Sequence, residues 1–332
     1  MDKAIIVDHL VKNFEVIEKK LGLKGAIDLI VSPKTKTIRA LKNISFTIQP
    51  GELVGFIGPN GAGKTTTLKI LSGLLYPTAG FTSVLGFDPW ERKPEFLKKI
   101  SLVMGQKNQL WWDLPAAETL ELNRAIYEIP KKEYEEVVSE LVTLLEVGKL
   151  LNIQVRRLSL GQRMRLELVA ALLHTPKVLY LDEPTIGLDL IAQQKMRDFI
   201  YEYNRRHEAT ILLTSHNMDD LMTLARRVIV IDEGQILFDG ALEELVSRFA
   251  KEKIIKVSLS REDDVKKIET IGKVKKISFP EVILSVPREA VAVAAAELLQ
   301  NFPVSDLTIE EIPIEDVIRK VFKGEMRRPL QK

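Results

Sequence analysis

The sequence predicts an α/β protein with buried parallel strands, because short apolar runs alternate with helical patterns from residue 1 to residue 249. Leu53–Ile57 runs into a glycine-rich turn, and Val178–Leu181 runs into two acidic residues. Ile211–Leu213 and Val228–Ile231 repeat this form, with amphipathic helical stretches between the runs. Apolar runs of four or five residues are typical of strands that are covered on both faces.

Three further segments interrupt or follow this plan. Residues 16–37 form an expected insertion with one short helix, and residues 115–155 form an expected helical subdomain. Residues 250–325 carry strand and helix patterns in the order βαββαβ, which favours a small α+β domain of the split-βαβ type.

The composition excludes several classes of protein. The 332 residues carry a net charge of +2 and no cysteine, which excludes disulfides and cysteine-based metal sites. This near-balance of charge gives no reason to expect a nucleic-acid partner. We find no run of about 20 apolar residues and no signal peptide, so we expect a soluble, cytoplasmic chain.

The turn after the first apolar run matches the phosphate-binding P-loop pattern in full: Gly58-Pro59-Asn60-Gly61-Ala62-Gly63-Lys64-Thr65. Its glycines allow backbone N–H groups to point at phosphate oxygens, and a helix N-terminus adds partial positive charge. We expect Lys64 to reach the β- and γ-phosphates, Thr65 to bind Mg²⁺ and Thr66 to contact the α-phosphate. The pattern therefore predicts an ATP site.

Two adjacent carboxylates, Asp182 and Glu183, follow the run that ends at Leu181. Ligands and chemistry belong at the carboxyl edge of a parallel sheet. Asp182 suits the shell of a Mg²⁺ ion, through water, and Glu183 suits a general base that polarises an attacking water. Together with the P-loop, this pair predicts nucleotide hydrolysis.

A third motif, Leu158-Ser159-Leu160-Gly161-Gln162, lies before an amphipathic helix and ahead of Glu183. It resembles the signature motif of ABC ATPases, although the usual form has glycine where this chain has Leu160. The resemblance covers residues 4 to 245. It implies that Ser159, Gly161 and Gln162 bind the γ-phosphate held by an opposite subunit, so that two subunits sandwich two ATP molecules head to tail.

The resemblance also implies roles for four other residues. Gln106 matches the Q-loop glutamine, near the metal and γ-phosphate, and His216 matches the switch histidine that contacts the γ-phosphate. Asp189 matches the D-loop residue that communicates across the dimer interface. Phe14 matches the aromatic residue that stacks on adenine, with a core position as its alternative.

Three stretches, residues 104–115, 73–80 and 313–317, are similar to those of bacterial type-2 ABC exporter ATPases. The implied partners are membrane permease subunits and a second copy of the chain or a homologous ATPase, on the inner face of the membrane. The alternative function is a non-transport ABC ATPase that acts on nucleic acid or ribosomes. Trp111 and Trp112 are expected either to line the groove for a permease helix or to lie in the subdomain core.

The sequence leaves the roles of two segments open. The 250–325 tail suits a dimer contact, a regulatory module or a structural extension. The 16–37 insertion resembles, in position, inserts of polysaccharide and teichoic-acid exporters, and it equally suits a plain surface loop.

Overall fold

The computed structural model describes residues 3–17, 35–105, 109–215, 217–249, 251–261 and 265–322. The chain divides into two compact units, Met1–Ala241 and Leu242–Lys332. This division assigns helix α9 (Leu242–Phe249) to the second unit, whereas the sequence pattern grouped it with the first.

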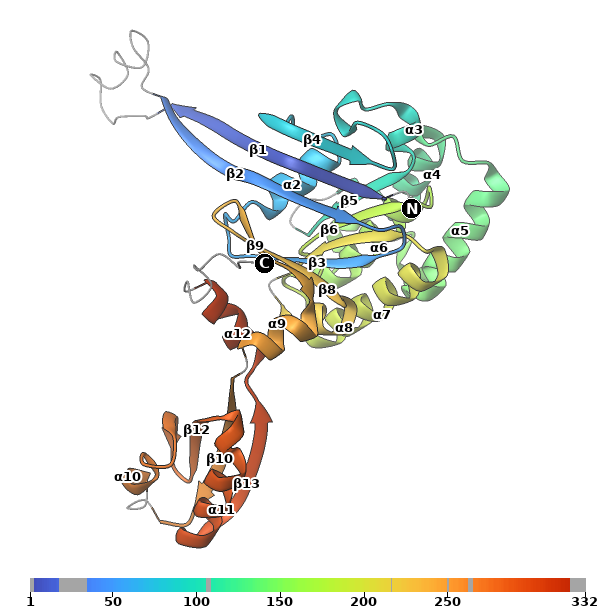
Figure 1. The fold of residues 1–332 in the computed structure, drawn as a ribbon. Coiled ribbons are helices and arrows are strands. Elements are labelled where there is room, and N and C mark those ends of the chain that lie inside the picture. The colour runs from blue at the N-terminus through green and yellow to red at the C-terminus, as the bar shows by residue number, and fades with distance from the viewer. Residues whose placement is uncertain are drawn as a thin grey trace, which may run out of the picture. The chain divides into compact units, whose positions relative to one another are not determined.

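A six-stranded sheet forms the centre of the first unit (Figure 1). Its neighbours follow the order β5 (Ile100–Met104), β6 (Val178–Asp182), β7 (Thr210–Thr214), β3 (Leu53–Ile57), β8 (Arg227–Asp232) and β9 (Gln235–Ala241). All adjacent pairs are parallel except β8 and β9, which are antiparallel. The apolar runs of the sequence form these strands, so the predicted α/β class is confirmed.

A second, antiparallel sheet has the order β2 (Thr35–Ile48), β1 (Ile5–Ile17) and β4 (Ala79–Val84). Strands β1 and β2 pair as far as Ile17 with Thr35. Both ends of the expected insertion at 16–37 are therefore strand. The short helix expected there falls on residues 18–34, outside the described part.

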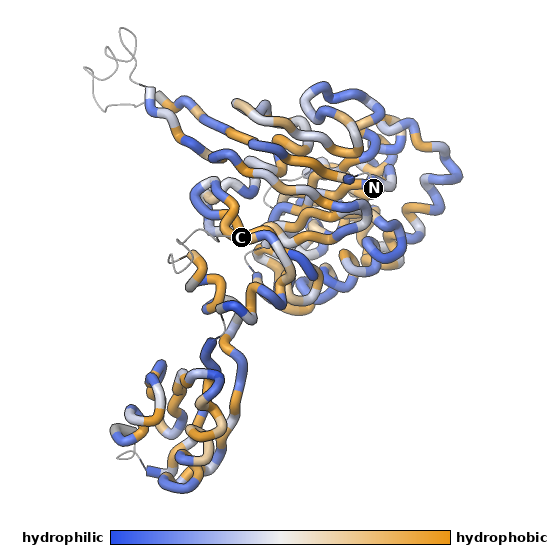
Figure 2. The backbone as a smooth tube through the Cα atoms, in the orientation of Figure 1, coloured by the Kyte–Doolittle hydropathy of each residue, from blue (hydrophilic) through white to orange (hydrophobic). Residues whose placement is uncertain are grey.

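Helix α2 (Lys64–Leu71) lies between the two sheets, in contact with β2, β4 and β6. Its Leu68 and Ile70 join a core with Ile5 of β1 and Phe56 of β3. Figure 2 shows hydrophobic segments concentrated along the strands of the six-stranded sheet. Burial of this apolar surface holds α2, and hence the P-loop before it, in a fixed position.

Helices cover the other face of the six-stranded sheet: α6 (Leu160–Leu172) contacts β5, α8 (Met218–Leu224) contacts β3, and α7 (Leu190–His207) contacts α8. Helix α6 also packs against α4 (Ala116–Ile126) and α5 (Lys131–Leu144). An isolated bridge joins Pro115 to Gln154, so the two ends of the helical segment meet. The remaining short helices are η1 (Pro89–Glu91), α3 (Pro94–Leu97), η2 (Gly148–Leu150) and η3 (Val155–Arg157).

The second unit contains an antiparallel sheet in the order β11 (Lys273–Ser278), β12 (Glu281–Pro287), β10 (Glu252–Leu259) and β13 (Val304–Glu311). The helices are α9, α10 (Val265–Ile268), η5 (Arg288–Ala290), α11 (Val291–Asn301) and α12 (Ile314–Lys320). Residues 252–311 follow the expected order βαββαβ. In the core of this unit, Ile255 and Leu284 pack against Leu298 of α11.

No helix in the described ranges combines the length and the apolar composition that a membrane crossing requires.

The core of the second unit makes a testable prediction. Ile255→Ala leaves a cavity between the sheet and α11, so we expect a loss of about 2–5 kcal/mol in the free energy of unfolding of this unit, measured by urea denaturation. The control is Ile309→Ala, which changes the residue paired with Ile255 on β13 at a position 41% exposed. It should cost less than about 1 kcal/mol. Equal losses for the two variants would contradict the burial assigned to Ile255, because the paired Ile309 lies on the same face at a more exposed position.

Candidate functional site

The glycine-rich loop joins β3 to α2. Every residue of β3 is buried, and α2 begins at Lys64. Gly63 has a φ of +112°, and a Cβ there would lie 2.9 Å from the carbonyl oxygen of Ala40. Only glycine adopts this conformation at such close approach. Asn60 and Gly61 of the loop are exposed.

Lys64 folds back over its own loop. Its side chain is 5% exposed, and its Nζ donates to the carbonyl oxygens of Gly58 at 2.5 Å and Pro59 at 3.1 Å. Burial lowers the pKa of Lys64, and the carboxylates of Glu183 and Asp182 oppose that effect. The structure thus brings the P-loop lysine together with both predicted acids.

Asp182 connects three elements at the carboxyl edge of the sheet. Its Oδ2 accepts a hydrogen bond from Thr65 Oγ1 of α2 at 2.7 Å. Its Oδ1 accepts one from Thr214 Oγ1 of β7, also at 2.7 Å. Both carboxylate oxygens are therefore held in place, and the Thr65 hydroxyl lies directly beside the acid that was predicted to share a metal ion with it.

Glu183 lies just beyond β6 in a left-handed backbone conformation, with a φ of +56°. Its backbone N–H donates to the carbonyl oxygen and to Oγ1 of Thr214, both at 3.1 Å. A Cβ on Gly105 would lie 2.3 Å from the carbonyl oxygen of Glu183. A left-handed conformation costs a non-glycine residue about 1–2 kcal/mol, and these tight neighbours hold it. The Glu183 side chain therefore leaves the sheet edge in one fixed direction.

The signature residues begin helix α6. Ser159 is its N-cap, and its Oγ accepts from the Gln162 backbone N–H at 3.2 Å. The Gln162 side chain accepts from the Ser159 N–H at 3.0 Å, which completes a capping box. Leu160 packs against Gly187, because a Cβ on that glycine would lie 2.9 Å from Leu160 Cδ2. Between described residues, no hydrogen bond or ion pair joins Ser159 or Gln162 to the P-loop.

No sequence pattern indicated one buried carboxylate, Asp220, which contacts the segments that follow β6 and β7. Asp220 accepts from Thr185 Oγ1 at 2.5 Å, from Ser215 Oγ at 2.7 Å and from Arg197 Nη1 at 2.9 Å. The side chains of Arg197 and Asp220 are 8% and 1% exposed. In the sequence, Asp219-Asp220 resembles an ordinary acidic first turn of a helix. Two partners of Asp220, Thr185 and Arg197, are distant in the sequence, and the third, Ser215, lies five residues before it. No local signal distinguished Asp220.

The other predicted site residues are placed as follows. Asp189 is the N-cap of α7, where its Oδ1 accepts from the Ala192 N–H at 2.8 Å. Thr66 is half-buried in α2. Phe14 is half-buried on β1 with Lys12 Nζ 5.0 Å from its ring centroid, so it is not a core residue. Gln106 and His216 lie outside the described residues, and their placement stays a prediction.

Comparison with known proteins agrees with this geometry. The family model described as ABC transporter matches residues 41–186, and one described as EvrA-like ABC transporter, C-terminal domain, matches residues 251–310. The ABC transporter ATP-binding protein NatA of Bacillus subtilis is 33% identical over 69% of this chain and 92% of its own length. The bacitracin transport ATP-binding protein BcrA of Bacillus licheniformis is 35% identical over 64% of this chain and 68% of its own.

Other relatives are much longer. The chain matches 26% of the length of ABC transporter A family member 1 of Dictyostelium discoideum, with 31% identity. Among solved structures, an ATP-binding subunit of an ABC transporter aligns with a TM-score of 0.61 and 23% identity over 74% of this chain and 93% of its own. A dimeric ATP-binding cassette bound to ADP and Pi aligns with a TM-score of 0.59 and 24% identity over 72% of this chain and 98% of its own.

A P-loop joined through Thr65 and Asp182 to the end of β6 defines the class as a P-loop ATPase. NatA is 33% identical to this chain over 92% of its own length. The chain therefore belongs to the family of ABC transporter ATP-binding proteins. The domain that binds ATP in this family is the first unit.

The buried Asp220 network makes a second prediction. Asp220→Asn removes the charge that compensates Arg197, so we expect the first unit to lose about 3–5 kcal/mol in its free energy of unfolding. Asp219→Asn changes the exposed neighbour on the same helical turn and should cost less than about 1 kcal/mol. Urea titration of both variants measures the difference. A mild effect of Asp220→Asn would mean that the Arg197 charge is compensated elsewhere.

Proposed function

We propose that this chain is the ATP-hydrolysing subunit of a membrane exporter, and that it works as a head-to-tail ATP-sandwich dimer with separate permease chains. The observation that carries the proposal is the meeting of Lys64, Thr65 and Asp182 at one sheet edge, with Glu183 held next to them. This set of groups suits phosphoryl transfer to water, where catalysis is mainly positioning and electrostatic stabilisation.

The present contacts of the Lys64 ammonium suit phosphate binding. The ammonium contacts two loop carbonyls, and phosphate oxygens carry more negative charge than these carbonyls do. The β- and γ-phosphates therefore displace the carbonyl contacts by a small movement of one side chain. Backbone N–H groups of the loop and the N-terminus of α2 add further donors, and Thr66 supplies a hydroxyl for the α-phosphate.

The residues present suit a Mg²⁺ ion. The Thr65 hydroxyl and the Asp182 carboxylate, two hard oxygen donors, lie 2.7 Å apart. Among the described residues no group of three or more His, Asp or Glu is arranged to hold a metal. Magnesium commonly takes one or two protein oxygens and completes its shell with water and nucleotide phosphates. When bound, the ion neutralises phosphate charge; Gln106 is proposed to contact it as well.

Hydrolysis requires a base beside the γ-phosphate. The Glu183 carboxylate accepts a proton from the attacking water, the water oxygen bonds to the γ-phosphorus, and the bond to ADP breaks. The fixed backbone of Glu183 sets the direction in which its side chain leaves the sheet edge before the substrate arrives. His216 is proposed to contact the γ-phosphate.

The signature residues suit a nucleotide bound by the opposite subunit. The Ser159 hydroxyl accepts from Gln162, so its own proton can be donated to a phosphate oxygen. The N-terminus of α6 adds partial positive charge, and Gly161 keeps the backbone accessible. ATP then stabilises the closed dimer, and hydrolysis weakens it. Such ligand-dependent closure can drive a coupled membrane protein.

The assignment of Glu183 as base can be tested directly. Glu183→Gln keeps the shape of the side chain and removes its basicity, so ATP should still bind while hydrolysis slows by about two orders of magnitude or more. With Mg-ATP the variant should accumulate as a dimer, measured by light scattering after size exclusion. Glu233→Gln is the control, because Glu233 is also left-handed but exposed. Normal ATP turnover by Glu183→Gln would show that Glu183 is not the general base.

Trp111 and Trp112 are exposed, at 56% and 47%, so the expectation that they form subdomain core is wrong. The guanidinium of Arg163, from α6, lies 5.3 Å from the ring centroid of Trp112. Exposed aromatic side chains on a surface next to the signature helix suit contact with a partner. We place the permease contact on this segment.

Replacing both tryptophans with alanine should separate coupling from catalysis. Basal ATPase activity of the purified chain should stay unchanged, because among the described residues no hydrogen bond or ring contact joins either side chain to the P-loop, Asp182 or Glu183. The fraction of the chain that sediments with membranes of its native cells should fall severalfold as the apolar contact is lost. Trp90→Ala, at an exposed tryptophan whose ring is tilted against that of Tyr76, is the matched control. Unchanged sedimentation of the double variant would exclude this surface as the contact.

A further inference from the structure

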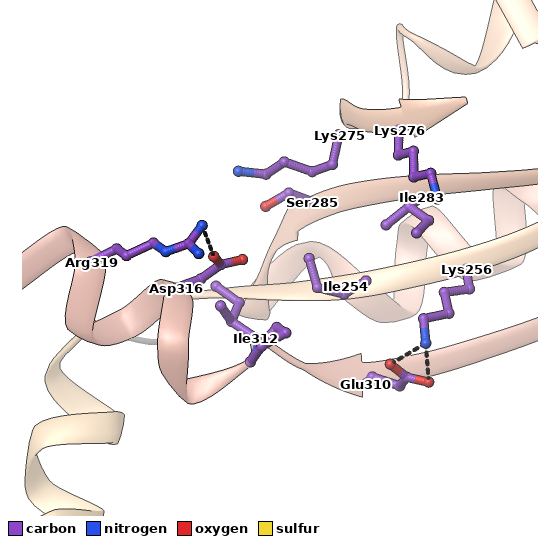
Figure 3. A pocket seen from close by; sticks show the side chains of 11 residues that line it. Ile254, Lys256, Lys275, Lys276, Ile283, Ser285, Glu310, Ile312, Asp316 and Arg319 are labelled. Atoms are coloured by element: carbon purple, nitrogen blue, oxygen red, sulfur yellow. Dashed lines mark hydrogen bonds and ion pairs between the residues drawn. The ribbon is translucent and has the colours of Figure 1, made fainter. Parts of the chain in front are cut away.

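The four-stranded sheet of the second unit uses its two faces differently. Ile255 and Val257 of β10 face the core beneath α11, whereas Ile254 faces the opposite side. On that opposite side, Val317 of α12 and Val246 of α9 cover only one end of the sheet. Next to this cover lies a pocket of about 500 Å³, lined only by residues of the second unit (Figure 3). Its volume lies in the range of small-molecule sites.

The floor of the pocket is apolar. Ile254, Ile283 and Ile312 line it, on strands β10 and β12 and just after β13. Ile254 and Ile312 are almost completely buried, and they extend the small cluster around Val317. A ligand that lies on this floor gains from burying its own apolar surface.

The walls of the pocket carry an excess of positive charge. Four basic side chains and two acidic ones line it. Lys256 Nζ pairs with Glu310 at 2.7 Å, and Arg319 lies 3.9 Å from Asp316. In the described part of the chain, Lys275 and Lys276 form no ion pair, so two positive charges remain for a ligand.

A bulge places Lys275 at the pocket. Strand β11 pairs Val274 with Leu284 and Lys276 with Ile283, so Lys275 is an extra residue without a pairing partner. The bulge breaks the alternation of faces, and both lysines line the same pocket although they are consecutive. Bulges of this kind re-aim a side chain and are frequent beside binding sites.

The buried hydroxyl of Ser285 is a second, independent observation at this pocket. The Ser285 side chain lines the pocket and is 3% exposed, and its Oγ has no hydrogen-bond partner among the described residues. Buried hydroxyl groups are normally satisfied, so an unpaired one needs an explanation. Ser285 and Lys275 both line the pocket, and in Figure 3 their polar ends extend in the same direction.

We propose that this pocket binds a small amphipathic organic anion. Its anionic group lies between the Lys275 ammonium and the Ser285 hydroxyl, which donates to it. Its apolar body lies on Ile254, Ile283 and Ile312. The second unit is thus a ligand-binding module attached to the ATPase, and the proposal holds whether or not the chain serves an exporter.

The test uses the full chain and the fluorescent anion 8-anilinonaphthalene-1-sulfonate. We expect saturable binding with a stoichiometry of one that depends on the second unit. The neutral analogue N-phenyl-1-naphthylamine, which keeps the rings and lacks the sulfonate, should bind at least about tenfold more weakly. Decanoate should displace the dye, and decanol should not.

Variants locate the site. Lys275→Gln should weaken dye binding at least about tenfold, whereas Lys251→Gln, which removes one charge from an exposed position of the same unit outside the pocket, should change it less than about twofold. Ser285→Ala should weaken binding and at the same time raise the thermal unfolding temperature, since an unpaired buried hydroxyl is removed. Misfolding would lower both.

Three results would overturn the proposal. Equal affinity for the anionic and neutral dyes would show an apolar patch only. Binding that Lys275→Gln leaves unchanged would place the dye elsewhere. An absence of saturable binding would show that the pocket is covered in the whole chain.

Discussion

The site depends on the Asp182 carboxylate, which joins Thr65 of the P-loop helix to Thr214 of β7. These two hydrogen bonds connect three segments that are far apart in the sequence. The charged acceptor makes each bond stronger than a neutral one, and the buried Thr214 keeps water away from one side of it. Because β6 and β7 are parallel neighbours in register, Asp182 and Thr214 face each other at the same edge. A single carboxylate therefore connects the helix that follows the phosphate loop to the strand beside Glu183.

A second buried carboxylate connects this edge to the surface that would meet another subunit. Asp220 binds Thr185, two residues after Glu183, and Ser215, one residue after Thr214. Its charge is balanced by Arg197 of α7, the helix that Asp189 caps. Hydrogen bonds thus run from the segment after Glu183 through Asp220 to Arg197 on α7. Leu160, the residue that departs from the usual signature motif, packs against Gly187 in the 187–189 turn.

Local patterns predicted the parts of the structure that local forces decide. The apolar runs identified β3, β6, β7 and β8. The P-loop pattern at residues 58–65 identified the loop between β3 and α2. Both signals lie within short segments of sequence, because they depend on local apolar residues and glycines. The Asp220 network, the bulge at Lys275 and the exposure of Trp111 depend on contacts between distant segments, and no window of sequence contains them. The helix expected in residues 18–34, Gln106 and His216 lie outside the described residues and stay predictions.

Nucleotide phosphates are proposed to bind where the Lys64 ammonium contacts the carbonyl oxygens of its own loop. The most direct measurement is the equilibrium affinity for a fluorescent ATP analogue of the wild-type chain, of Lys64→Ala, and of Lys69→Ala as a control on the last turn of the same helix. The structure predicts that Lys64→Ala loses at least about tenfold in affinity, because an ammonium–phosphate contact disappears, while Lys69→Ala binds like wild type. Equal affinity of the wild type and Lys64→Ala would contradict the account, since the P-loop lysine would then have no part in holding the nucleotide.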